Sequence, residues 1–216
     1  TGKKVRMELG LDQASPVIAL FPGSRKEVVT NLLPVMIEAA EKIRSKHARL
    51  KCLLPRALTI PAELLDGLLR ESSLDVQVIQ GDVYRVLKAC DLALVASGTA
   101  TLEAAILETP MVIVYRVSFF SYWIGKLVIS VPFIGLVNLV AGEEVVPELI
   151  QGDVTPERLA QEAMGILEHD DKRRVMIKKL RALRETLGQG SASERTARIA
   201  LEMIDSSPTG GETKKR

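Results

Sequence analysis

The chain has 216 residues, of which 47% are hydrophobic and 26% are charged, and its formal net charge is +2. This length accommodates one large domain or two small ones. The near-neutral charge and the aromatic fraction of 4% argue against a nucleic-acid partner, which would need a basic face or stacking platforms. Cys52 and Cys90 have no CxxC spacing and no neighbouring His, so we expect small core residues in a reducing compartment.

Strand-like and helix-like segments alternate along the first half of the chain. Short apolar runs predict strands at residues 17–21, 51–54, 76–80, 92–95 and 111–115. Helical periodicity predicts helices at residues 26–45, 61–71, 84–89 and 100–107. Pro34 predicts a kink in the first helix, or a helix that begins only near Asn31. The succession predicts an α/β fold, a Rossmann-like parallel sheet with helices on both faces.

The last third of the chain changes to a purely helical pattern. Amphipathic spacing predicts C-terminal helices at residues 155–168, 170–187 and 192–204, the first with Thr155 as its N-cap and Pro156 in its first turn. Residues 206–216 are polar and rich in Gly, Ser, Thr and Lys. We therefore expect a single domain over residues 1–205, followed by a disordered tail over residues 206–216.

Residues 117–140 form a long apolar stretch that contains five aromatic side chains. Its length would allow a membrane span, but Ser, Gly, Pro, Lys and Asn residues interrupt it. We favour a buried connection made of a helix and a strand. An exposed apolar face that meets a lipid or another domain is the alternative.

The first candidate binding motif is the turn Phe21-Pro22-Gly23-Ser24-Arg25, which joins a predicted strand to a predicted helix. Gly23 permits close approach of the backbone, Ser24 offers a hydroxyl, and Arg25 offers a charged planar group suited to phosphate. The amino end of a helix adds unpaired N–H groups and partial positive charge. The motif is neither a Walker A loop nor a Gly-x-Gly-x-x-Gly turn, and a simple tight turn with a solvated Arg is the alternative.

The second motif, Ser97-Gly98-Thr99, has the same position after a strand and before a helix. Glu103 follows one helical turn later, where a carboxylate can accept hydrogen bonds from a ribose diol. The alternative makes Thr99 an N-cap and Glu103 a favourable charge near the helix dipole. Together the two turns predict one anionic ligand, a nucleotide, at one edge of the sheet.

A third cluster consists of Asn138 and the acidic residues Glu143, Glu144 and Glu148. These side chains could bind sugar hydroxyls, and a solvated acidic first turn of a helix is the alternative. The sequence contains no Asp-x-Asp and no HExxH motif, so we expect neither a metal nor a cofactor. His47 and His169 lie near predicted helix C-termini, where the dipole stabilises them as surface residues.

At these residues the chain resembles the lipid-A-disaccharide synthases. The resemblance runs from about residue 5 to residue 204 and rests on several blocks in order: the two turns, Val114-Tyr115-Arg116, Gly135-Leu136-Val137-Asn138-Leu139 and Glu144-Val145-Val146-Pro147-Glu148. The family more often has Leu-Pro-Asn where this chain has Leu136-Val137-Asn138. The resemblance implies the GT-B glycosyltransferase fold, of which this chain would be the C-terminal, nucleotide-sugar-binding half, with the N-terminal half missing.

The resemblance also implies an activity and its site. The family transfers the sugar of UDP-2,3-diacylglucosamine to 2,3-diacylglucosamine 1-phosphate, with inversion and without a metal, releasing UDP and forming the lipid A disaccharide. By position, the diphosphate would meet Gly23, Ser24, Arg25, Ser97, Gly98 and Thr99. Glu103 would bind the ribose, and the donor sugar would face Asn138, Glu144 and Glu148.

Other expectations follow from the same resemblance. The general base would come from the absent half, so the chain alone would bind UDP weakly and not turn over. Its partners would be the two acylated substrates, the missing N-terminal domain and no nucleic acid, with a membrane surface and a homodimer left open. The enzyme would be cytoplasmic, peripheral on the inner membrane. The alternatives are a UDP-N-acetylglucosamine 2-epimerase-like enzyme and a non-enzymatic nucleotide-binding module.

Overall fold

The computed structural model describes residues 2–11, 15–117, 132–187 and 192–205. The chain divides into two compact units, Thr1–Arg184 and Glu185–Arg216, and each is described by itself. In the second unit, helix α10 (Ala192–Asp205) exposes the apolar side chains Ile199, Leu201, Met203 and Ile204.

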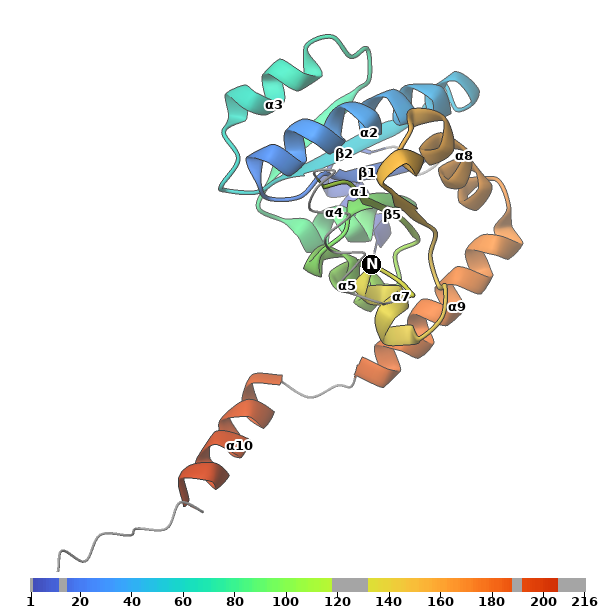
Figure 1. Ribbon diagram of the computed structural model, residues 1–216. Helices are drawn as coiled ribbons and strands as arrows, with labels where there is room; N and C mark the ends of the chain where they lie inside the picture. Colours follow the sequence, from blue (N-terminus) through green and yellow to red (C-terminus); the bar gives the residue numbers. More distant parts are fainter. Residues whose placement is uncertain (1, 12–14, 118–131, 188–191, 206–216) are drawn as a thin grey trace, which may run out of the picture. The chain divides into compact units, whose positions relative to one another are not determined.

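A parallel sheet of six strands in the order β3-β2-β1-β4-β5-β6 forms the centre of the first unit (Figure 1). The strands are β1 (Val17–Phe21), β2 (Lys51–Arg56), β3 (Val76–Gln80), β4 (Leu92–Ala96), β5 (Met111–Tyr115) and β6 (Glu148–Ile150). Every residue of β1 and β4 is buried, as in strands that are covered on both faces. The two central strands, β1 and β4, are therefore the strands that end at the two predicted turns.

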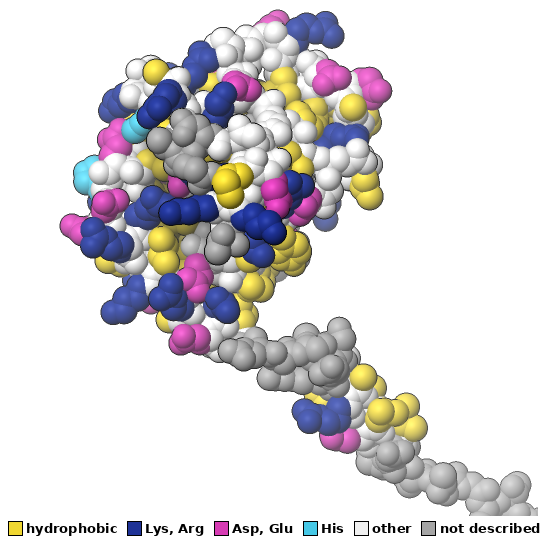
Figure 2. Space-filling view, turned by 180° about the vertical axis from the view of Figure 1, so that it is seen from behind, with side chains coloured by type: hydrophobic (Ala, Val, Ile, Leu, Met, Phe, Trp, Pro, Cys, Tyr) yellow, Lys and Arg dark blue, Asp and Glu magenta, His cyan; other side chains and the backbone are white. Residues whose placement is uncertain are grey.

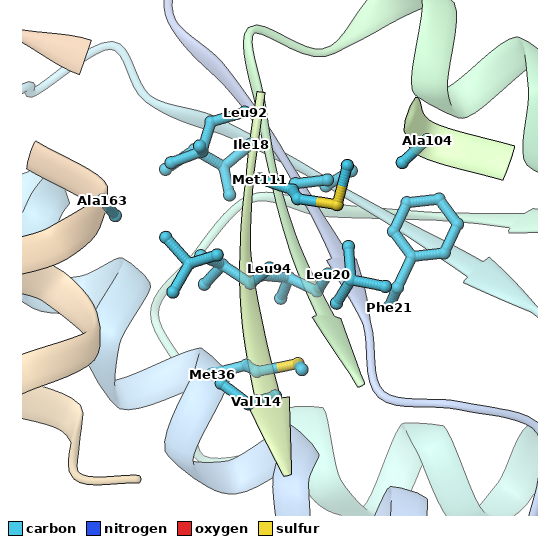
Figure 3. Packing of buried hydrophobic residues seen from close by; sticks show 14 of the residues in the cluster. Ile18, Leu20, Phe21, Met36, Leu92, Leu94, Ala104, Met111, Val114 and Ala163 are labelled. Carbon is cyan, nitrogen blue, oxygen red and sulfur yellow. The ribbon is translucent and has the colours of Figure 1, made fainter. Parts of the chain in front are cut away.

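Helices cover both faces of this sheet. They are α1 (Gly2–Glu8), α2 (Lys26–Lys46), α3 (Ala62–Leu69), α4 (Val83–Ala89), α5 (Thr99–Ile106), α7 (Leu136–Ala141), α8 (Pro156–Leu167) and α9 (Asp170–Leu187). Helix α2 packs against α8 on one face, while α4 with α1 and α5 with α7 cover the other (Figure 1). In the core, Met36 of α2 and Ala163 of α8 lie on one side of the strands and Ala104 of α5 on the other (Figure 3).

Most predicted elements are present within two residues of their expected ends, and the predicted Rossmann-like α/β fold with C-terminal helices is confirmed. Thr155 is the N-cap of α8, because its side chain accepts a hydrogen bond from the Arg158 N–H at 3.2 Å. The alternative in which α2 starts near Asn31 is wrong, since the helix begins at Lys26 and runs through Pro34. Eight buried side chains on one face of α2 stabilise it despite the missing N–H of the proline.

Among the described residues, four short elements were missed by the sequence patterns: α1, α7, the three-residue edge strand β6 and the 3-10 helix η1 (Gln151–Asp153). Each is too short to show a clear period. Of the apolar stretch at residues 117–140, residues 118–131 lie outside the described part of the chain, as does the tail at 206–216. Among the helices that the structure describes, none is long and apolar enough to cross a membrane.

Candidate functional site

The strand order reverses between β1 and β4, because the chain continues outward to β2 and β3 on one side and to β5 and β6 on the other. Loops that follow two such strands diverge and leave a crevice at the carboxyl edge of the sheet. Phe21 at the end of β1 pairs with Val95 of β4, so the two predicted motifs start side by side. A Cβ added to Gly23 would lie 3.8 Å from Ala96 Cβ. The structure therefore brings the two turns together at the crevice.

The first turn leads directly into the amino end of α2. Gly23 has a φ of 104°, a backbone conformation that L side chains rarely adopt. Arg25 is the N-cap residue and makes no capping hydrogen bond, and its exposed guanidinium has no ion pair within the described residues. Thr59 Oγ1 donates to the carbonyl oxygen of Ser24 at 2.7 Å, so the loop after β2 supports the turn. The first N–H groups of a 21-residue helix thus face the crevice beside a free cation.

The second turn begins helix α5. Its N-cap is Gly98, without a side-chain cap, so the alternative in which Thr99 is the N-cap is wrong: Thr99 is the first helical residue and is exposed. The buried Thr101 holds the turn, with its Oγ1 donating to the Gly98 carbonyl at 2.7 Å. Glu103 lies one turn after Thr99 on the same side of the helix and is half-buried. No hydrogen bond or ion pair occupies its carboxylate among the described residues.

Ser97 uses both of its donors inside the protein. Its N–H donates to the carbonyl of Val114 at 2.9 Å, and its Oγ donates to the carbonyl of Ile134 at 3.3 Å. In this arrangement Ser97 joins the second turn to β5 and to the segment before α7. The groups at this turn that remain available to a ligand are the N–H groups and hydroxyl of the following residues, Gly98 and Thr99.

Asn138 is fully buried in α7, and its amide is saturated. Its Nδ2 donates to the Val146 carbonyl at 2.8 Å and to Glu148 Oε1 at 2.7 Å, while its Oδ1 accepts from the N–H groups of Val145 at 2.8 Å and Val146 at 3.0 Å. These four bonds use the two donors and two acceptor positions of the amide. Asn138 therefore has no group left with which to contact a sugar directly in this structure.

The structure does not bring Glu144 together with the two turns. Helix α7 starts at the carboxyl edge beside Ser97 and ends at Gly142, which takes up the left-handed conformation. Beyond it, Glu143 pairs with Lys179 of α9 at 2.6 Å, and Glu144 is exposed. The sequence patterns missed α7, and this helix carries Glu144 to the opposite, amino edge of the sheet. Glu148, by contrast, reaches back to the start of α7, accepting from the N–H groups of Ile134 and Gly135.

The two histidines and the two cysteines were predicted to have structural roles, and their positions in the structure agree with such roles. His47 is the C-cap residue of α2, with its Nε2 3.2 Å from Glu168 Oε1, and His169 lies between α8 and α9. Burial raises the pKa of the Cys52 and Cys90 thiols to about 12, so both are protonated at neutral pH. In the described part of the chain, no group of three His, Cys, Asp or Glu side chains could hold a metal ion.

Two further side chains at this edge were not among the predicted site residues. Gln151, with a φ of 52°, accepts from the Val117 N–H at 2.8 Å and donates to the Val117 carbonyl at 3.1 Å. Arg116 donates to the carbonyl of Val154. Both hold the chain just after β5. Arg116 belongs to a block on which the family resemblance rests, whereas Gln151 belongs to none of those blocks. Figure 2 shows one face of the first unit, on which basic and acidic side chains are interspersed.

Comparison with known proteins agrees with this architecture. The family profile described as lipid-A-disaccharide synthetase matches residues 1–203. The lipid-A-disaccharide synthase of Myxococcus xanthus is 40% identical over 204 residues, covering 94% of this chain and 53% of that protein. The enzyme of the same name from Syntrophus aciditrophicus is 45% identical over 199 residues, covering 92% and 52%. The chain thus spans about half the length of the curated relatives that it matches.

Solved structures with a similar fold include a glycosyltransferase and a protein in complex with UDP-glucose. WaaG, a glycosyltransferase involved in lipopolysaccharide biosynthesis, has a TM-score of 0.65 at 17% identity, covering 91% of this chain and 50% of its own. HepE of Anabaena in complex with UDP-glucose has a TM-score of 0.61 at 14% identity, covering 94% and 52%. At such identities the likeness shows the fold alone. The family profile covers nearly the whole sequence, and the chain therefore belongs to the lipid-A-disaccharide synthetase family.

Proposed function

We propose that this chain is the nucleotide-sugar-binding half of a lipid-A-disaccharide synthase. It binds UDP-2,3-diacylglucosamine, from which the whole enzyme transfers the sugar to 2,3-diacylglucosamine 1-phosphate with inversion, releasing UDP and forming the lipid A disaccharide. One observation carries the proposal: the amino ends of α2 and α5 meet at the strand-order reversal, and the exposed Arg25 at the start of α2 has no ion pair within the part of the chain that the structure describes. Family membership supports the choice of substrate.

The diphosphate would lie between the two turns. The free N–H groups that follow Gly23 and Gly98 and the hydroxyls of Ser24 and Thr99 would donate to its oxygens. Arg25 would add a charge-assisted, bidentate contact. Because negative charge builds on the diphosphate as UDP leaves, these donors stabilise the leaving group as well as the substrate. This arrangement provides for departure of UDP without a metal or other cofactor.

The ribose and the sugar would extend from the diphosphate in two directions. Glu103 is one turn into α5, where its unpaired carboxylate can accept hydrogen bonds from the ribose diol. The donor sugar would sit beyond Ser97, against the amino end of α7. In this proposal Glu148 and Asn138 support that wall from behind, and Glu144 is no longer included, because it lies at the other edge of the sheet.

Catalysis would require the other half of the enzyme. We propose that the general base belongs to the N-terminal half, so that this chain alone binds UDP without turning over the substrates. The acylated substrates place the whole enzyme at the cytoplasmic face of the inner membrane. Its partners are then these substrates, the N-terminal half and the membrane surface.

Titration of the chain with UDP by calorimetry tests the proposal. Arg25→Ala and Glu103→Ala should each weaken UDP binding by roughly 1–3 kcal/mol, because each removes a charge-assisted hydrogen bond. The matched controls are Arg70→Ala and Glu71→Gln, exposed residues at and just after the C-terminal end of α3, away from the crevice, and they should leave the affinity unchanged.

Two outcomes would contradict the proposal. Binding of ADP in preference to UDP would exclude a uridine nucleotide site. If the Arg25 and Glu103 variants bind UDP as tightly as their controls, neither residue contacts the ligand. Arg25 would then be a solvated residue in a turn, and Glu103 a favourable charge near a helix dipole. Joined to its N-terminal half, the enzyme should form a disaccharide from the acylated substrates, whereas epimerisation of UDP-N-acetylglucosamine would favour the epimerase alternative.

A further inference from the structure

A chain of hydrogen bonds connects the buried amide of Asn138 to the second turn of the candidate site. Asn138 Nδ2 donates to Glu148 Oε1 at 2.7 Å. The Glu148 carboxylate accepts from the N–H groups of Ile134 at 2.9 Å and Gly135 at 3.0 Å. Ser97 Oγ then donates to the Ile134 carbonyl at 3.3 Å. Three segments that are separate in the sequence are thus joined behind the crevice.

The segment before α7 packs closely against the Glu148 carboxylate. A Cβ added to Gly135 would lie 2.5 Å from Ile113 Cδ1 and 2.8 Å from Glu148 Oε1, so the carboxylate and β5 leave no space there for a side chain. Asn138 is fixed as well, because its Oδ1 accepts from two backbone N–H groups of the loop before β6. Both members of the pair are therefore held in place by backbone on each side.

We propose that Glu148 and Asn138 are positioning residues for the diphosphate site. They hold the segment before α7, and this segment holds Ser97, so that the free N–H groups at Gly98 and Thr99 are directed into the crevice. Neither side chain contacts the ligand. The inference rests on the proposed UDP site. It gives a supporting role to two residues that, by the family resemblance, would contact the sugar.

A double-mutant cycle in UDP binding tests this role on the full chain. Glu148→Gln replaces one carboxylate oxygen by an NH2 group, which cannot accept from the backbone N–H group that donates to that oxygen, and it should weaken UDP binding about tenfold, the equivalent of one lost hydrogen bond. If Glu148 acts through Ser97, then Ser97→Ala should weaken binding by a similar factor, and the double variant should be no weaker than either single variant. Glu71→Gln is the matched control and should bind UDP like the wild type.

A second variant supplies a readout that a loss of stability alone would not change. Asn138→Asp keeps the shape and the acceptors for the loop, but places a second carboxylate beside Glu148. Like charges at this distance raise the pKa of one of the two groups, and the protonated form again donates between them. The deficit in UDP affinity relative to the wild type should therefore be about tenfold at about pH 8 and should shrink at about pH 6.

The outcomes separate this inference from the proposed function. A wild-type chain that binds no UDP overturns both. If the wild type binds UDP and Arg25→Ala weakens it, the site stands. In that case wild-type affinity in a folded Glu148→Gln variant, additive effects of Glu148 and Ser97, or a deficit of Asn138→Asp that does not change with pH would each overturn the positioning role.

Discussion

At the scale of single residues, the backbone of Gly23 shapes the first turn. Its φ of 104° is open to glycine and strained for other residues. An added Cβ would lie 3.4 Å from Val28 Cγ1 and 3.8 Å from Ala96 Cβ, which are ordinary contacts. The requirement for glycine therefore comes from the path of the chain between β1 and α2 and not from lack of space.

Substitution of this glycine should separate backbone strain from packing. We expect Gly23→Ala to lower the free energy of unfolding by ~1–2 kcal/mol and to weaken UDP binding, because the turn must shift. Gly67→Ala in α3 is the matched control: its added Cβ meets nothing within 4 Å, and its φ is not positive. That change should raise the free energy of unfolding by ~0.5–1 kcal/mol. Urea denaturation measures both, and effects of the same sign would contradict this account.

At the scale of elements, an acidic residue at the end of α5 anchors α9. Glu108 accepts from Arg181 Nε at 3.1 Å and Nη2 at 2.8 Å, and from Arg184 Nη1 at 3.0 Å. Its side chain is 18% exposed, whereas those of the arginines are 61% and 54% exposed. The hydrogen bond from Arg181, together with the charges of both arginines, lowers the pKa of the Glu108 carboxyl. The favourable contact therefore exists in the charged form.

This anchor should make a pH-dependent contribution to stability. We expect Glu108→Gln to lower the free energy of unfolding at neutral pH by about 1 kcal/mol, because both arginines remain largely solvated. Since the pKa is lowered on folding, the contribution is present above the unfolded value of about 4.3 and is lost as the pH falls through the lower folded value. The variant and the wild type should then converge in acid. A difference that persists there, or an equal effect of Glu71→Gln, would exclude the ion pairs as the cause.

At the scale of the whole first unit, one carboxylate joins three parts of the fold at the amino edge of the sheet. Asp91, just before β4, accepts from Arg6 of α1 at 2.6 Å, from the Val17 N–H at the start of β1 at 2.9 Å and from Arg173 of α9 at 3.4 Å. Arg6 and Asp91 are 12% and 21% exposed. These contacts of Asp91 lie at the edge opposite the two glycine turns.

Removal of this carboxylate should therefore affect stability and leave binding intact. Asp91→Ala should lower the free energy of unfolding by ~2–3 kcal/mol, because it removes the carboxylate that balances the charge of the largely buried Arg6. Asp75→Asn is the control: it breaks the ion pair with Lys51, in which Asp75 is 67% exposed, and should cost at most about 0.5 kcal/mol. UDP affinity, measured by calorimetry below the unfolding transition, should match the wild type in both. Weakened UDP binding by folded Asp91→Ala would show that the two edges are coupled.

The sequence alone predicted the strands and helices that show a clear hydrophobic period. The apolar runs that became β1 and β5 carry their bounds in the sequence, since a buried parallel strand needs an uninterrupted apolar segment. Short elements lacked such a pattern. The family resemblance placed Glu144 beside the sugar, whereas in the structure it is exposed and follows Glu143, which pairs with Lys179 of α9.

By itself, then, the sequence determined the alternation of strands and helices, the two glycine turns at strand ends and the family to which they point. These features follow from residues adjacent in the chain. The tertiary structure alone decided that the exposed Arg25 has no ion pair among the described residues, that the Asn138 amide is consumed internally, and that hydrogen bonds through Ile134 connect Glu148 to Ser97. Whether a buried polar side chain has all of its hydrogen bonds depends on which backbone groups, distant in the sequence, lie next to it. The strand order and the path of α7 determine which groups these are.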